Sequence, residues 1–231
     1  SHTIHILILG CICVTRIIWH GHACFEIVSD TGVVIGIDPH DGYSLGISPP
    51  GFKADIILST HDHFDHNAIN VIAKPNAKVY RMFADEDEVN GIKIKGLPTY
   101  HDDVGGALRG RNIMYSIIVD GLKVVHAGDL GCIPEESIIE EIKGCDILMV
   151  PVGGTYTLGP KDSAKLVELI VPKITIPMHY RYDGLKLSIK EVNDFLRYVK
   201  FPIEPVKGNT LEITKEKIPL QPKVIVLEPP R

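Results

Sequence analysis

The chain has 231 residues, of which 45% are hydrophobic and 23% charged, so it can bury a core and is excluded from the disordered proteins. Its formal net charge of -5 disfavours a nucleic-acid partner, because general nucleic-acid binders usually carry a basic excess. The charge is compatible with a small-molecule anionic substrate that a few local arginines bind. No linker or low-complexity tract divides the sequence, so we expect a single domain over residues 1–231.

The first 15 residues contain the longest apolar run, ILILGCICV at residues 6–14. This run is too short to span a bilayer, and it lacks the basic start and the cleavage site of a signal peptide. We therefore predict a cytoplasmic protein without a membrane partner, in which residues 1–15 add an N-terminal strand. The five cysteines are odd in number and have no CxxC spacing, so we expect buried, reduced thiols.

Short runs rich in isoleucine and valine predict strands. They occupy residues 24–28, 33–37, 55–59, 78–82, 92–95, 113–119, 122–126, 146–150, 174–177 and 223–228. The dipeptide DG at residues 120–121 separates two of these runs and predicts a tight hairpin.

Helices are predicted where apolar residues recur at spacings of three and four. Such patterns cover residues 134–144, 160–171 and 188–200, and a short helix is expected within residues 65–74. The first pattern begins with proline and acids and ends in Lys-Gly, which is the polarity of a helix. Strands come first as meanders and later alternate with helices, so we expect mixed sheets covered by helices.

The segment THDHFDH at residues 60–66 places three histidines and two aspartates directly after the apolar run ADIILS. His61 and His63 are spaced so that both imidazoles can bind one cation. Asp65 and His66 follow at the start of the predicted short helix. These four groups could hold two cations, but two metal ions need more ligands, which the rest of the chain has to supply.

Three distant residues each follow a strand-like run, as His61 does. His101 follows IKIKGLPTY, Asp129 follows LKVVHAG and His179 follows ITIPM. Ligands at the ends of several strands converge at one edge of a sheet. Imidazole and carboxylate groups without thiolates suit zinc, manganese or iron. Each residue alone would be read as structural, but together with HxHxDH they indicate a metal site.

The order HxHxDH, distant His, distant Asp and last His resembles the signature of the metallo-β-lactamase superfamily. The resemblance covers the chain from Ile17 to the predicted helix near residue 200. The first 15 residues have no counterpart in the family. The stretches GHACFEI, IDP, GGALRGRN, HAGDLG, PVGG and PMHY are similar to the L-ascorbate-6-phosphate lactonase-like hydrolases. The resemblance implies an α/β fold, a four-layer αββα sandwich of two mixed β-sheets with the metals at the sheet edge.

The resemblance also implies two divalent metal ions, zinc first and manganese or iron as alternatives. It assigns His61, His63 and His101 to one ion, Asp65, His66 and His179 to the other, and Asp129 as the bridge. A water shared by two cations loses its proton near neutral pH and becomes a hydroxide nucleophile, which Asp65 would orient as the catalytic residue. No GxSxG motif is present, so no serine nucleophile is expected.

Several residues could protonate a leaving group or support the site. His22, in GHACF, is a candidate to line the pocket, and Tyr156 is a second candidate. His126 is a third, for which a structural role is favoured. Asp38, in IDP, is expected to support the site through hydrogen bonds without binding metal.

Three arginines are candidates for binding an anionic substrate. Arg109 and Arg111 could bind a phosphate in a bidentate manner, although a solvated loop would explain them equally well. Arg181 is a further candidate because it lies two residues after His179.

The sequence therefore predicts a metal-dependent hydrolase that acts on a small anionic ester or lactone. A phosphodiesterase with the same dinuclear site, acting on small phosphodiesters or nucleic acid, is the alternative. A basic groove or an added RNA-binding arm would favour it, and the sequence has neither. A non-catalytic relative would usually have lost a ligand, whereas all seven are present. A homo-oligomer is compatible with each of these functions.

Overall fold

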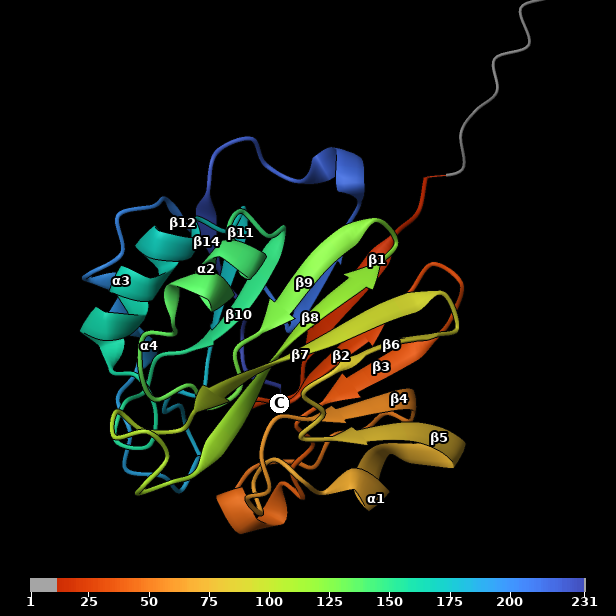
Figure 1. The fold of residues 1–231 in the computed structure, drawn as a ribbon, viewed down its shortest axis with the longest axis horizontal. Helices are drawn as coiled ribbons and strands as arrows, with labels where there is room; N and C mark the ends of the chain where they lie inside the picture. The colour runs from red at the N-terminus through yellow and green to blue at the C-terminus, as the bar shows by residue number, and fades with distance from the viewer. Residues whose placement is uncertain (1–11, 231) are drawn as a thin grey trace, which may run out of the picture.

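Two β-sheets packed face to face form the centre of the protein in the computed structural model, which describes residues 12–230 (Figure 1). The six-stranded sheet has the order β13-β1-β2-β3-β4-β5, and the eight-stranded sheet has the order β12-β14-β11-β10-β9-β8-β7-β6. Both sheets are mixed, since each combines antiparallel and parallel pairs. The predicted pair of mixed sheets is therefore confirmed.

The first sheet brings residues from both ends of the described chain together. Its strands are β1 (Thr15–Trp19), β2 (Phe25–Val28), β3 (Val34–Ile37), β4 (Ala54–Ser59), β5 (Ala73–Arg81) and β13 (Thr210–Ile213). Strands β1 and β13 were not predicted, and β5 begins earlier than predicted. Pro75 lies inside β5, which is tolerated because β5 is an edge strand and pairs only with β4.

The second sheet begins as a meander and continues as parallel strands. Its strands are β6 (Glu86–Val89), β7 (Ile92–Tyr100), β8 (Arg111–Val119), β9 (Leu122–His126), β10 (Ile147–Pro151), β11 (Ile174–Met178), β12 (Ile203–Pro205) and β14 (Lys223–Val226). The predicted hairpin is confirmed, because Val119 pairs with Leu122 and both turn residues, Asp120 and Gly121, have positive φ. The missed strands β6 and β12 are short, polar edge strands without an apolar pattern.

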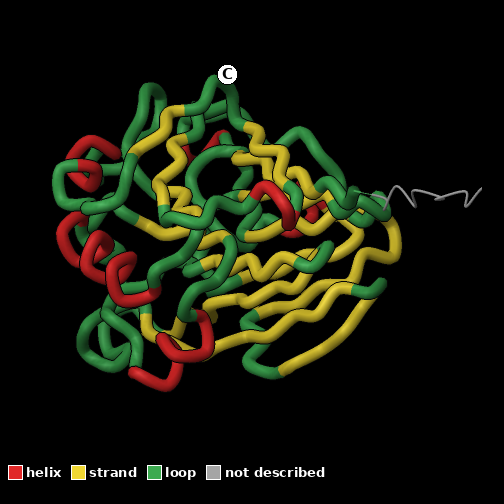
Figure 2. Tube along the Cα trace, turned by 90° about the horizontal axis from the view of Figure 1, so that it is seen from above, coloured by secondary structure: helices red, strands yellow, loops and turns green. Residues whose placement is uncertain are grey.

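Helices cover the outer faces of both sheets. They are α1 (Ile69–Ile72), α2 (Glu136–Ile142), α3 (Pro160–Ile170) and α4 (Val192–Leu196), with short 3-10 turns at η1 (Tyr43–Leu45) and η2 (Lys215–Lys217). Figure 1 shows α2, α3 and α4 beside the second sheet and α1 beside the first, and Figure 2 shows most of the helices gathered at one margin of the strands. The αββα order is confirmed, although the layer over the first sheet is thin.

The helix predicted over residues 188–200 is shorter than expected. Only Val192–Leu196 is α-helical. The residues before it bond to other segments: Lys190 N–H donates to Gly153 O at 2.8 Å, and Arg181 N–H donates to Lys190 O at 2.8 Å. The backbone N–H and C=O of Lys190 therefore bond to other segments and are not available for the hydrogen bonds of a longer helix.

The main hydrophobic core lies between the sheets and continues under the helices of the second sheet. Trp19, Phe25 and Tyr115 are among its largest fully buried side chains. Burying one such side chain contributes about 1.5–3 kcal/mol. Trp19 Nε1 also donates a hydrogen bond of 3.0 Å to His22 O, so the core holds the turn that carries a predicted site residue.

The predicted N-terminal strand falls mainly outside the described residues. Residues 12–14 are not in a strand, and β1 begins at Thr15. Cys24 and Cys145 are buried as expected, whereas Cys132 is half-buried and Cys13 is exposed, which corrects that expectation; Cys11 is not among the described residues. None of the helices in residues 12–230 is long and apolar enough to cross a bilayer.

Candidate metal centre

The candidate ligands meet because the strands that precede them end at the same side of the molecule. In the first sheet β1, β3 and β4 run in one direction, and in the second sheet β7, β9 and β11 do. His22 follows β1, Asp38 follows β3, residues 60–66 follow β4, His101 follows β7, Asp129 follows β9 and His179 follows β11. The carboxyl ends of such strands form one edge, where the side chains converge.

Asp129 lies at the centre of the cluster. Its Oδ2 atom is 3.3 Å from His61 Nε2, 3.1 Å from His66 Nε2 and 3.0 Å from His101 Nε2, and its Oδ1 atom is 3.3 Å from His179 Nε2. Burial alone would raise the pKa of Asp129, but the imidazoles of His179 and His66 hold it well below the ordinary value. Asp129 is therefore an anion placed among imidazoles from both halves of the cluster, which suits a bridging ligand.

The remaining ligand atoms form two neighbouring groups. One contains His61, His63 and His101, and the other contains His22, Asp65, His66 and His179; in each, the atoms lie within 4.8 Å of one another, as they also do in a third group of Asp38, His61 and His66 that overlaps both. The first two groups match the two ligand sets that the resemblance implies, with His22 added to the second. The structure thus brings together all seven predicted ligands.

The unpaired buried atoms of the cluster fit divalent metal ions. Nε2 is buried without a hydrogen-bond partner among residues 12–230 in His61, His66, His101 and His179, and so is Asp129 Oδ1. A buried polar atom without a partner costs about 1–3 kcal/mol, so a convergent set of them is the arrangement expected of metal ligands. Imidazole and carboxylate donors suit zinc, manganese or iron.

Asp38 supports the ligands through hydrogen bonds, as predicted. It accepts from the Thr60 backbone N–H at 2.8 Å and from the Thr60 hydroxyl at 2.6 Å, and His66 Nδ1 lies 2.9 Å from its Oδ2. Thr60 Oγ1 is also 2.8 Å from His61 Nδ1. These contacts place the N–H of each imidazole on Nδ1, so that Nε2 of His61 and His66 can face a metal.

His22 holds Asp65 and does not line the substrate cavity described below. It is fully buried, and its Nε2 lies 2.8 Å from Asp65 Oδ2. Burial, helped by His179, lowers the pKa of His22 to about 3, so the neutral ring can donate its N–H to Asp65. His22 is not among the residues that line this cavity, in contrast to the expectation for it, and it contacts Asp65 instead.

His126 has the structural role that was favoured for it. Its Nε2 lies 2.9 Å from Ala23 O, and its Nδ1 accepts the Gly128 N–H at 3.0 Å. Both nitrogens of this buried ring are thus occupied by the backbone.

Asn112 is a supporting residue that the sequence analysis missed. Its Oδ1 accepts the Asp129 N–H at 2.9 Å, and its Nδ2 donates to Ala127 O at 2.9 Å. Gly128 allows this approach, because a Cβ there would lie 2.3 Å from Asn112 Oδ1. Asn112 ends the GGALRGRN stretch, which is one of the stretches that resemble the family, so this stretch could have identified it as a candidate.

Three residues at the site adopt left-handed backbone conformations. His22, Asp38 and His179 have φ values of 54°, 50° and 52°. Such conformations cost of order 1–3 kcal/mol each in non-glycine residues and cluster at functional sites. Each marks the point where the chain turns sharply after a strand and aims its side chain at the cluster.

A cavity of about 520 Å³ lies over the ligands. Its floor includes His63, Asp65, His101 and Asp129. The structure places two predicted substrate-binding residues in its walls, Arg109 and Tyr156, with the Arg109 guanidinium 5.6 Å from the centre of the Tyr156 ring. The other residues of the walls, which were not predicted, are Asp62, Phe64, Leu108 and Leu187.

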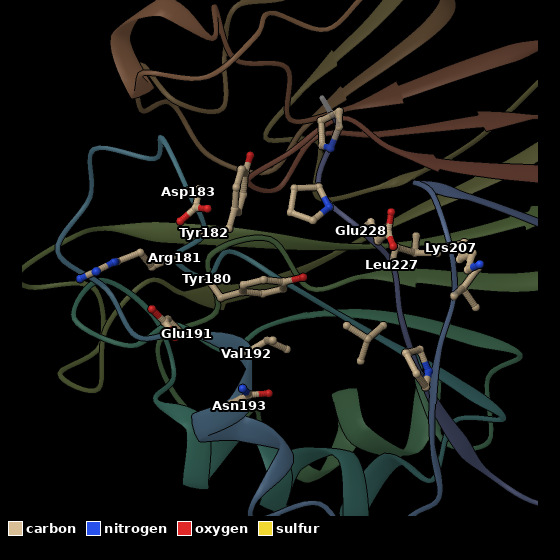
Figure 3. Close-up of a pocket in the computed structure, with 15 residues that line it drawn as sticks. Tyr180, Arg181, Tyr182, Asp183, Glu191, Val192, Asn193, Lys207, Leu227 and Glu228 are labelled. Carbon is tan, nitrogen blue, oxygen red and sulfur yellow. The ribbon is translucent and has the colours of Figure 1, made fainter.

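Arg111 and Arg181 do not reach this cavity, which corrects their assignment. Arg111 begins β8 after Gly110, whose φ of 81° turns the chain, and it lines a separate cavity. Arg181 lines the cavity of Figure 3, and its side chain there points away from Tyr180. Because His179 has a left-handed conformation, the alternation of side chains between the two faces of the sheet, which holds along β11, does not extend to Arg181.

The fold and the ligand set define the class of metallo-β-lactamase-fold metal-dependent hydrolases. The model of the Beta-lactamase superfamily domain matches residues 16–179, a range that contains all seven ligand residues. The chain belongs to this superfamily and, within it, to the UPF0173 metal-dependent hydrolases.

Individual relatives show how far the similarity extends. A UPF0173 metal-dependent hydrolase of Thermococcus onnurineus is 33% identical over 183 residues, which cover 69% of this chain and 82% of that protein. One of Staphylothermus marinus is 36% identical over 190 residues, 69% and 81% of the two chains. The crystal structure of a candidate zinc-dependent hydrolase from Thermotoga maritima is 35% identical, with a TM-score of 0.74, and covers 94% of this chain and 100% of that one.

Proposed function

We propose that this metal-dependent hydrolase uses two metal ions to cleave a small anionic ester or lactone. The observation that carries the proposal is a cavity whose floor is formed by metal-ligand candidates and whose wall contains one cation, Arg109. The net charge of -5 supports a small substrate over a nucleic acid. We further propose a cytoplasmic location. A small phosphodiester would suit the same ligands and is the second candidate.

The chain's own residues would position the reactants. Two divalent ions, zinc first, would lower the pKa of a water molecule and polarise the scissile group. Asp65, held by His22, lies half-buried in the cavity floor, where its carboxylate can orient the attacking water. Arg109 would bind the anionic group of the substrate, and Tyr156, which lines the same cavity, would protonate a leaving group.

We expect the metal-loaded protein to contain two divalent ions per chain, because the ligand atoms form two groups joined by Asp129. Elemental analysis and anomalous diffraction measure the number and the positions. His20→Asn is a matched control, since His20 pairs with Glu26 and belongs to neither group. A single occupied position at saturation, with His179 turned away from it, would contradict the two-metal site.

We expect a phosphate on the substrate to raise kcat/KM, and Arg109→Ala to reduce that advantage by roughly 10- to 100-fold, the worth of a hydrogen bond to a charged group. The assay compares a lactone phosphate, its unphosphorylated form and a simple phosphodiester. Arg111→Ala is the control, because Arg111 lines a different cavity. Equal rates on both lactones would refute anion recognition, and a much faster phosphodiester would favour the second candidate.

A further inference from the structure

We propose that the cavity over the metal centre selects substrates whose non-reacting part is apolar and carries one anionic group, and that it discriminates against polyhydroxylated, sugar-like substrates. This inference rests on the proposed hydrolase function, because it concerns the substrate of the same site. It concerns the walls of the cavity, whereas the metal ligands form its floor.

The walls offer few partners for substrate hydroxyls. Apart from the ligand candidates, they consist of Asp62, Phe64, Leu108, Arg109, Tyr156 and Leu187. Asp62 Oδ1 accepts a hydrogen bond of 2.8 Å from Asn67 Nδ2, so the polar groups left for a substrate hydroxyl are Asp62 Oδ2, the Tyr156 hydroxyl and the Arg109 guanidinium. A sugar-like substrate would bring several hydroxyl groups against Phe64, Leu108 and Leu187, where they would lose hydrogen bonds to water without replacement.

The apolar wall residues are exposed in the absence of a substrate. Phe64 is 61% exposed and Leu108 is 73% exposed. A single exposed apolar side chain is ordinary, but these two line the same cavity as Leu187 and the Tyr156 ring. An apolar substrate group would remove their surfaces from water, which favours binding in proportion to the area covered.

Hydrogen bonds to Asp102 order the backbone of the loop that carries Leu108 and Arg109 before a substrate arrives. The Asp102 carboxylate accepts four backbone N–H groups, from Val104 at 3.0 Å, Gly106 at 2.7 Å, Leu108 at 3.0 Å and Arg109 at 2.8 Å. Leu108 and Arg109 therefore sit side by side on an ordered loop. A substrate that fits both carries its charge next to its apolar part.

A binding experiment tests this selectivity independently of turnover. Calorimetry on the metal-loaded protein compares hexyl phosphate with glucose 6-phosphate, which share a six-carbon body and one phosphate. We expect hexyl phosphate to bind about 10-fold more tightly or better, as apolar pockets discriminate over this range. Equal binding, or tighter binding of glucose 6-phosphate, would overturn the proposal.

Variants locate the preference in the walls. Phe64→Ser and Leu108→Ser are each expected to reduce the ratio of the two binding constants by several-fold, and both residues are exposed, so folding is little affected. Leu220→Ser is the matched control, because Leu220 is 89% exposed and lies outside the cavity lining. If neither Phe64→Ser nor Leu108→Ser changes the ratio of the two binding constants, the proposal is overturned.

Kinetics separate this inference from the proposed function. The assay compares kcat/KM for an alkyl-substituted and a polyhydroxylated lactone, each of which carries one phosphate. We expect the alkyl-substituted lactone to have the higher kcat/KM. No turnover of any ester, lactone or phosphodiester would contradict the proposed function, while the calorimetric ratio would still decide the selectivity. Faster turnover of the polyhydroxylated lactone would overturn the selectivity alone.

Discussion

Asp129→Ala is expected to remove metal binding and hydrolytic turnover together. The Asp129 carboxylate is the anion that imidazoles from both ligand groups surround, at distances of 3.0–3.3 Å. Without it both ions would lose a ligand, and no anion would remain between the two cations to offset their mutual repulsion. The loss should exceed the roughly 10- to 100-fold that follows from removing an outer-shell partner. His61→Ala, which removes another ligand, is expected to act in the same way.

The measurement combines elemental analysis after gel filtration with kcat on the best substrate found. Asp129→Asn tests the charge alone, because it keeps the shape of the side chain. Asp162→Ala serves as the control, since Asp162 is an exposed residue in the first turn of α3 and far from the ligand groups. An Asp129 variant that keeps its metals and the wild-type rate would show that Asp129 is not a ligand.

Asp38→Asn is expected to weaken metal binding and activity by about 10- to 100-fold without touching a ligand directly. Asp38 is fully buried and lies 2.9 Å from His66 Nδ1. An amide placed there either leaves that N–H unpaired or favours the tautomer that carries its proton on Nε2, which cannot bind metal. Asparagine tolerates the left-handed conformation of this position, so the backbone should be preserved.

The affinity is measured by competition with a chelator, and the His66 tautomer by nitrogen chemical shifts. Asp146→Asn is a matched control at a second buried aspartate, which binds Lys123 N–H and Lys215 Nζ away from the metal centre. This control should lower the free energy of unfolding but leave metal affinity unchanged. Unaltered metal affinity in Asp38→Asn would contradict the role assigned to Asp38.

The fold and the metal ligands were predictable because their signals are local. Strands such as Val34–Ile37 and Ile147–Pro151 are apolar runs, and each distant ligand candidate follows a strand-like run directly or within three residues. A residue at the end of a strand is placed by the direction of that strand, so topology alone brings His101, Asp129 and His179 to one edge. Short polar edge strands such as Glu86–Val89 lack this signal and were missed.

The sequence by itself therefore predicted most of the strands and a metal site, and its resemblance to a known family implied the sandwich of two sheets and the set of seven candidate ligands. Only the tertiary structure decided which other residues reach the substrate. Three arginines were candidates for binding the substrate, yet among them only Arg109 lines the cavity over the ligands, whereas Arg111 and Arg181 line other cavities. His22 and the apolar walls around Phe64 and Leu108 were likewise decided by packing between segments far apart in the chain, which a local pattern does not record.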